Sequence, residues 1–239
     1  MKLIHNSEIA TTDDTLFTPI FDLLGEIVGM DVENLPFPNP EVQKHVQFII
    51  RNIAKNIDVP SIFAYITEDF DSLHDPKYDE LYVNIFILLN NVINELEEVP
   101  EDFQNDEIVI QSVFEVIHHI LQECRHTLTV ESLRFFLALF NFSPLESQSH
   151  ILSFLNPETF ESFWYAVTGC DSDLLEAFLN IIESILSKWG RLGFENGEYT
   201  ELLNNVIPSY LNELVPDDER MMARLQGLLK DYYPDFDAS

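Results

Sequence analysis

Hydrophobic residues recur at helical spacing along most of the chain, from about residue 14 to residue 230. In residues 42–57, for example, the apolar positions fall three or four residues apart and polar residues occupy the opposite side. A stripe with this period indicates an amphipathic helix that buries one face. No segment shows the convincing two-residue alternation of a half-buried strand. The pattern therefore predicts an all-α protein without a sheet.

The pattern divides into about nine to eleven helices joined by short polar or proline-rich links. The expected helices cover residues 16–28, 42–57, 61–70, 78–96, 107–123, 130–141, 144–155, 157–167, 172–189, 199–214 and 217–230. Pro40 suits a first helical turn, and Ser143 and Asn156 precede prolines as plausible N-caps. Because no link is long enough to separate domains, we expect one helical domain over residues 14–230. An N-terminal extension (1–13) precedes it and an acidic, aromatic tail (231–239) follows it.

Composition narrows the class of protein further. The 239 residues are 46% hydrophobic, which is enough for one continuous core, and the 7 glycines are too few to favour phosphate-cradling loops. Only Cys124 and Cys170 are present, so a disulfide framework is not expected, and a reducing compartment (cytoplasm or nucleus) is favoured. The longest apolar runs are far too short to cross a bilayer, and no signal peptide is recognisable.

The charge balance is strongly acidic, with 42 Asp and Glu against 12 Lys and Arg and a net charge of −30. Such a field repels phosphate backbones and anionic lipids, so we expect neither nucleic acid nor membrane as a partner. No basic residue occurs between Lys77 and Arg125, a span that contains Glu95 and Glu98. A basic protein segment is the favoured partner, although acidity that serves only solubility is the alternative.

A short phrase recurs along the chain: an apolar residue, one spacer, Asn and another apolar residue. Its asparagines are Asn52, Asn91, Asn141 and Asn180, at intervals of 39, 50 and 39 residues. These intervals suit helical repeats of about 40 residues, with an insertion around residues 95–107. The phrases at residues 48–54 and 137–143 resemble the third helix of an armadillo repeat, and the resemblance covers about residues 40–190.

This resemblance implies a right-handed α-solenoid of armadillo/HEAT-like repeats with a concave groove. In that family the groove asparagines hydrogen-bond the main chain of an extended peptide, because a primary amide both donates and accepts. The peptide-binding positions expected here are Asn52, Asn91, Asn141, Asn180, the acidic Glu95 and Glu98, and the aromatic Trp164. The repeat lengths are uneven and the family's glycine between the first two helices is missing. Burial of these asparagines with local hydrogen bonds is the alternative.

A small basic patch interrupts the acidic trend. Lys44, Arg51 and Lys55 share one face of the second helix, and Phe48 lies nearby. The patch could receive an acidic loop of a partner or the protein's own acidic tail, and intramolecular neutralisation is the simpler of the two.

Motifs for catalysis or metal binding are missing. The sequence holds no G-x-G-x-x-G, Walker A, G-x-S-x-G or H-E-x-x-H phrase. The histidines His118, His119 and His126 with Cys124 are better interpreted as surface residues than as metal ligands. We therefore expect no catalytic residue, no metal and no cofactor, and a protein-binding adaptor, scaffold or regulatory module. An all-α enzyme using His118 or His119 with carboxylates, or a structural subunit of a fixed complex, is the alternative.

Overall fold

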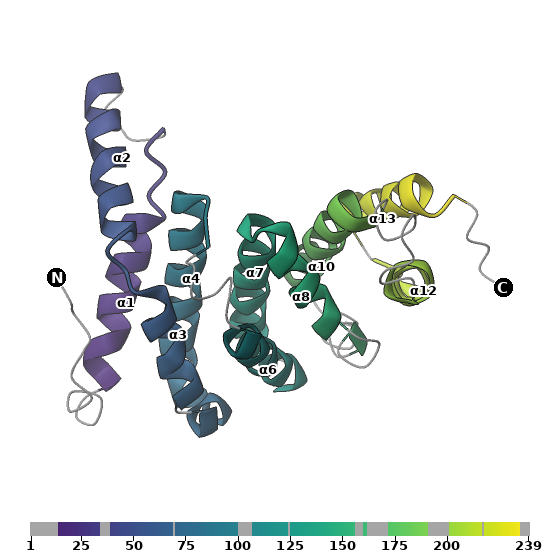
Figure 1. The fold of residues 1–239 in the computed structure, drawn as a ribbon, viewed down its shortest axis with the longest axis horizontal. Helices are drawn as coiled ribbons and strands as arrows, with labels where there is room; N and C mark the ends of the chain where they lie inside the picture. The colour runs from purple at the N-terminus through teal and green to yellow at the C-terminus, as the bar shows by residue number, and fades with distance from the viewer. Residues whose placement is uncertain are drawn as a thin grey trace. The chain divides into compact units, whose positions relative to one another are not determined.

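The computed structural model describes residues 14–33, 39–68, 70–99, 107–123, 125–155, 160–161, 172–190, 201–216 and 218–234. Every secondary-structure element in these ranges is helical and none is a strand, which confirms the all-α class. The chain separates into two compact units, residues 1–109 and 110–239. Figure 1 shows the helices of each unit. The stacking of repeats into a solenoid stays a prediction.

Unit 1 is built around one buried helix. It contains α1 (Asp14–Val28), α2 (Pro40–Ala54), α3 (Val59–Glu68), the 3-10 turns η1 (Phe70–His74) and η2 (Pro76–Tyr78), and α4 (Asp79–Leu96). α4 packs against α1, α2 and α3 (Figure 1). Contact with three neighbours explains why its sequence is apolar on nearly every side, since Ile85, Phe86 and Leu89 are all fully buried.

The start of α2 follows directly from its sequence. Asn39 is extended, and its side chain accepts hydrogen bonds from the main-chain N–H groups of Glu41 and Val42, while Pro40 occupies the first turn. The burial of α2 is less complete than its amphipathic pattern suggests. Only Ile50 and Ala54 are buried, and three large apolar residues stay exposed: Val42, Phe48 and Ile49.

Unit 2 contains the rest of α6 (Glu107–Glu123) from Ile110 on, α7 (His126–Phe142), α8 (Leu145–Phe154) and α10 (Ser172–Ile185), which continues through the π-helical turn η3 (Leu186–Gly190). After the second π-helical turn, η4 (Leu202–Val206), come α12 (Ile207–Glu213) and α13 (Glu219–Tyr232). α10 packs against α7 and α13, and α13 also packs against α12. Among the described helices of both units, none is long and apolar enough to cross a bilayer.

The core of unit 2 combines aromatic packing with satisfied polar groups. Phe114 and Phe136 meet edge to face across α6 and α7, with ring centroids 5.4 Å apart. The buried Trp189 donates its indole N–H to the Gln148 side-chain oxygen at 3.0 Å. That bond matters because an unpaired buried polar group costs about 1–3 kcal/mol.

The structure corrects two local expectations. α7 begins at His126 rather than at residue 130. Ser143 is not the N-cap of α8, since it ends α7 and its hydroxyl donates to the Leu139 carbonyl one turn back. A serine hydroxyl can satisfy either the last turn of one helix or the first turn of the next, and here the preceding helix holds it. The expected cap at Asn156 and most of the helix expected over residues 157–167 lie outside the described residues.

Candidate functional site

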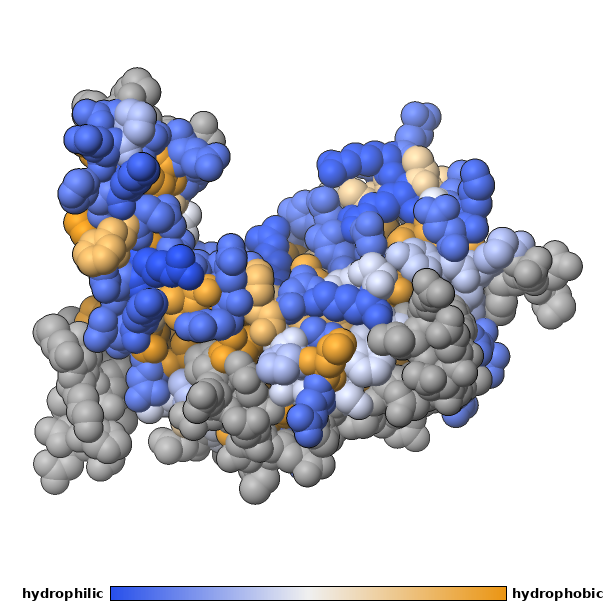
Figure 2. Space-filling model, turned by 45° about the horizontal axis from the view of Figure 1, so that its top comes forward, coloured by the Kyte–Doolittle hydropathy of each residue, from blue (hydrophilic) through white to orange (hydrophobic). Residues whose placement is uncertain are grey.

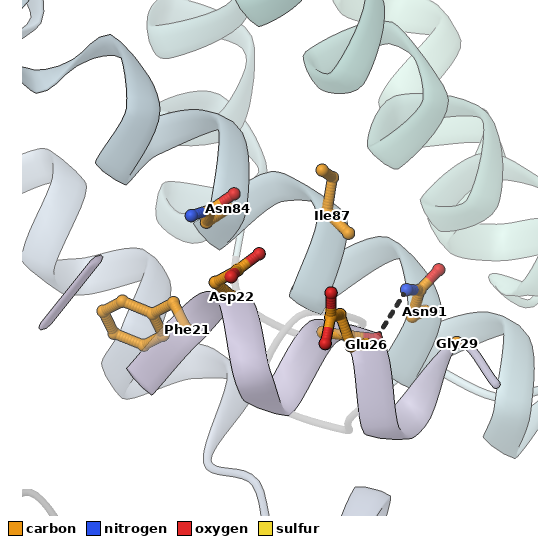
Figure 3. A pocket seen from close by; sticks show the side chains of 8 residues that line it. Phe21, Asp22, Glu26, Gly29, Asn84, Ile87 and Asn91 are labelled. Atoms are coloured by element: carbon orange, nitrogen blue, oxygen red, sulfur yellow. Dashed lines mark hydrogen bonds between the residues drawn. The ribbon is translucent and has the colours of Figure 1, made fainter. Parts of the chain in front are cut away.

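A shallow pocket of about 200 Å³ lies between α1 and α4 in unit 1. Its lining comes from both helices: Phe21, Asp22, Gly25, Glu26 and Gly29 from α1 and the residue after its end, and Asn84, Ile87 and Asn91 from α4. Figure 3 shows the Asp22 and Glu26 carboxylates rising from α1 towards the α4 side chains. The pocket therefore combines two acids, two amides and an apolar wall.

Two glycines, one turn apart, bring α1 close to α4. The main-chain oxygen of Gly25 accepts a hydrogen bond from the Gly29 N–H at 2.8 Å and a second from Asn91 Nδ2 at 3.1 Å (Figure 3). A Cβ atom at Gly29 would lie 3.0 Å from Asn91 Cγ and closer still to Nδ2, so a side chain there would displace the amide. The glycine thus allows Asn91 to cap the end of α1, and the Asn91 amide oxygen keeps its acceptor capacity for a ligand.

The two carboxylates of the pocket have no partner among the described residues. Asp22 and Glu26 are exposed and lie four positions apart on α1, where like charges repel by about 0.2–0.5 kcal/mol. On α4, Asn84 donates its amide N–H to the Thr18 carbonyl at 3.5 Å and keeps its side-chain oxygen unused. Four oxygen-bearing side chains therefore line this pocket, and its two unpaired carboxylates suit a cation such as a lysine or arginine head group.

The two predicted asparagines of unit 2 link neighbouring helices. Asn141 on α7 accepts from the Ser184 hydroxyl and, at 3.1 Å, from Lys188 Nζ, both of which belong to the α10–η3 segment. Asn180 on α10 accepts from Arg224 of α13 at 2.6 Å. In both residues only the amide oxygen is used, so each NH₂ group has no acceptor among the described residues.

The acids beside Asn180 differ from those on α1 because the chain neutralises them itself. Glu176 lies 3.4 Å from Arg220, and Glu183 pairs with Arg224. Lys188, between α7 and α10, lies in a partly buried position that lowers the pKa of its amine below the ordinary value. This surface of unit 2 therefore offers amide donors with little free negative charge.

The other predicted residues of unit 1 are not part of the pocket lining. Asn52 is exposed on α2 and donates to the Phe48 carbonyl of its own helix at 2.7 Å. Glu95 accepts from Gln47 through both carboxylate oxygens, at 2.7 and 2.8 Å, and so ties α4 to α2. Glu98 is exposed just after α4. Trp164 lies outside the described residues, and the peptide-binding role of the whole set stays a prediction.

Three pocket residues with polar side chains were not singled out from the sequence: Asp22, Glu26 and Asn84. A signal for them was present, because Gly25 and Gly29 stand one turn apart in a chain with only 7 glycines. Small residues at that spacing indicate close approach of a second helix, and the polar residues beside them then line the contact.

The histidines of α6 make contacts within their own helix. The His118 ring nitrogen Nε2 lies 2.9 Å from Gln122 Nε2, and His119 Nε2 lies 3.7 Å from a Glu123 carboxylate oxygen. Pairing one turn apart is ordinary for residues on a helix.

Comparison with protein-family models, curated proteins and solved structures finds no match for the chain.

Proposed function

We propose that the protein is a non-enzymatic protein-binding module, an adaptor or scaffold, that holds a basic segment of its partner. The observation that carries the proposal is the α1–α4 pocket, where Asp22 and Glu26 lack partners among the described residues and share the lining with Asn84 and Asn91. An acidic protein of net charge −30 would also attract such a segment over distance.

In the proposed complex a lysine or arginine head group of the partner enters the pocket. Its N–H groups donate to the Asp22 and Glu26 carboxylates. The apolar stem of the same side chain packs against Ile87, as long basic side chains do on apolar surfaces. Exposed ion pairs contribute only about 0–1 kcal/mol each, so useful affinity needs several such contacts along an extended segment.

We propose a complementary role for the asparagines of unit 2. The NH₂ groups of Asn141 and Asn180 would donate to main-chain carbonyls of the partner, which requires no particular partner sequence. Their amide oxygens are already fixed by Lys188 and Arg224, which holds the donors in place. The pocket would then supply charge selectivity, and these amides would supply contacts to any backbone.

The test compares two charge-matched double variants. Asp22→Asn with Glu26→Gln removes both pocket charges, whereas Glu201→Gln with Glu213→Gln removes two exposed charges of unit 2. Binding of a fluorescein-labelled, Lys/Arg-rich peptide is measured by anisotropy at rising salt, and circular dichroism checks that each variant is folded. We expect about a tenfold loss of affinity for the pocket variant and little change for the control. Equal affinity of the two double variants would refute the pocket as the binding site.

A further inference from the structure

The outward face of α2 carries a stripe of one aromatic and three basic residues, the α2 stripe. Lys44, Phe48, Arg51 and Lys55 follow one another at intervals of four, three and four residues, which places them in one line along the helix. All four are exposed, and Phe48 is 69% exposed. Figure 2 shows hydrophobic side chains within the otherwise hydrophilic surface of this part of unit 1.

The three cations of the α2 stripe have no partner within the described residues. Lys77, the only other Lys or Arg in the described part of unit 1, pairs with Asp75 at 2.9 Å. In unit 2, Arg134, Arg220 and Arg224 are also paired with acids. Phe48 is the one aromatic among the exposed large hydrophobic residues of the described ranges, so unpaired cations beside an exposed aromatic ring are peculiar to α2 there. This is notable in a chain where acids outnumber bases 42 to 12.

The helix that carries the α2 stripe is held in place by packing and by hydrogen bonding to α4. Ile50 and Ala54 anchor the opposite side of the helix in the core, and Gln47 binds both Glu95 carboxylate oxygens on α4. From Lys44 to Lys55 the helix advances about 16 Å, because each residue adds 1.5 Å. That length matches about five residues of an extended chain or three turns of a helix.

We propose that the α2 stripe is a second docking surface, which binds an acidic peptide segment of a partner protein that carries an aromatic or aliphatic side chain. The acids pair with Lys44, Arg51 and Lys55, and the apolar side chain covers Phe48. Aromatic residues and arginine dominate the energetics of protein interfaces, which favours this pairing of an apolar anchor with flanking charges.

The charge of the whole chain favours an acidic peptide over a nucleic acid. Over distance the protein's net charge of −30 repels any polyanion, and a phosphate backbone carries one charge per nucleotide along its whole length. A short peptide with a few acids experiences less repulsion, since at physiological salt charges beyond about 8 Å are largely screened. Close contact with three cations then outweighs the distant acids.

The experiment uses the full chain and synthetic peptides. The probe is a labelled acidic peptide rich in Glu and Asp with spaced Phe and Leu residues, compared with the same peptide carrying Ser in place of Phe and Leu. The stripe variants are Phe48→Ser and Arg51→Glu. Their controls are Val215→Ser, which removes another exposed apolar side chain, and Lys230→Glu, which makes the same charge change on α13.

We expect saturable binding of the Phe/Leu-containing peptide, weakened about tenfold or more by Phe48→Ser and by Arg51→Glu and unchanged in both controls. The Asp22→Asn, Glu26→Gln double variant should bind this acidic peptide normally, which separates the α2 stripe from the α1–α4 pocket. Failure of the peptide to bind, or equal binding by stripe and control variants, overturns the proposal.

Two further outcomes would assign the surface to a different occupant and also overturn it. One is self-association in sedimentation velocity that Phe48→Ser abolishes, which would identify a second copy of the chain. The other is tight binding of a single-stranded oligonucleotide that needs Phe48 and Arg51, since bases also stack on aromatic rings.

Discussion

Gly29 offers a direct test of how the pocket is built, through the substitution Gly29→Ala. The new Cβ atom would lie 3.0 Å from Asn91 Cγ and 3.1 Å from the Gly25 oxygen, where 3.4 Å or more is ordinary contact. The Asn91 amide can swing away, but it then loses its 3.1 Å hydrogen bond to Gly25. The end of α1 thereby loses one of the two donors that satisfy this oxygen.

The magnitude follows from three contributions. Loss of the Asn91 hydrogen bond costs about 1 kcal/mol, and crowding against the Gly25 oxygen adds to that cost. Replacing glycine by alanine adds back about 0.4–1 kcal/mol to the free energy of unfolding, because it lowers the conformational entropy of the unfolded chain. The free energy of unfolding should therefore fall by about 1 kcal/mol. Displacement of the amide should also weaken binding of the basic peptide at the pocket.

The matched control is Gly227→Ala on α13, where an added Cβ atom meets nothing within 4 Å. Alanine in an open helical position should raise the free energy of unfolding by about 0.5–1 kcal/mol. The two alanine variants should thus shift the midpoint of urea unfolding, measured by circular dichroism, in opposite directions. A Gly29→Ala protein as stable as Gly227→Ala would refute the packing of Asn91 against Gly29.

Two buried ionisable groups predict how stability depends on pH. Burial raises the pKa of Glu131 above its ordinary 4.5, although the nearby Arg134 acts in the opposite direction. The folded state therefore binds the Glu131 proton more tightly than the unfolded state does. As a result, the free energy of unfolding falls as pH rises through the folded-state pKa. Glu131→Gln should flatten that fall and raise the melting temperature at pH 7; an unchanged pH profile would contradict this. Burial also raises the pKa of Tyr233 above its ordinary 10.0, and the Tyr233 hydroxyl donates to the Leu203 carbonyl at 2.6 Å. Above pH 10.0 this tyrosine ionises in the unfolded state but stays protonated in the folded state, so the free energy of unfolding falls as pH rises. Tyr233→Phe should cost about 1 kcal/mol at neutral pH and remove this alkaline loss in thermal scans, whereas an equal alkaline loss in both proteins would count against the assignment.

The sequence alone determined the class of fold and most helix positions, because these depend on neighbours three or four residues away. The apolar period located α4 and α6, and Pro40 marked the start of α2. Capping and amphipathicity are local properties, so a short segment of the sequence is enough to predict them.

Tertiary structure decided what each polar residue does. The same Asn phrase donates to its own helix at Asn52, caps another helix at Asn91 and accepts from Arg224 at Asn180. Their partners lie 4, 66 and 44 residues away along the chain, and only the packing of helices brings the distant ones within hydrogen-bond reach. Likewise α2 has an amphipathic pattern much like that of a buried helix, yet Val42 and Ile49 of its apolar side stay exposed because burial depends on the neighbours that a helix meets.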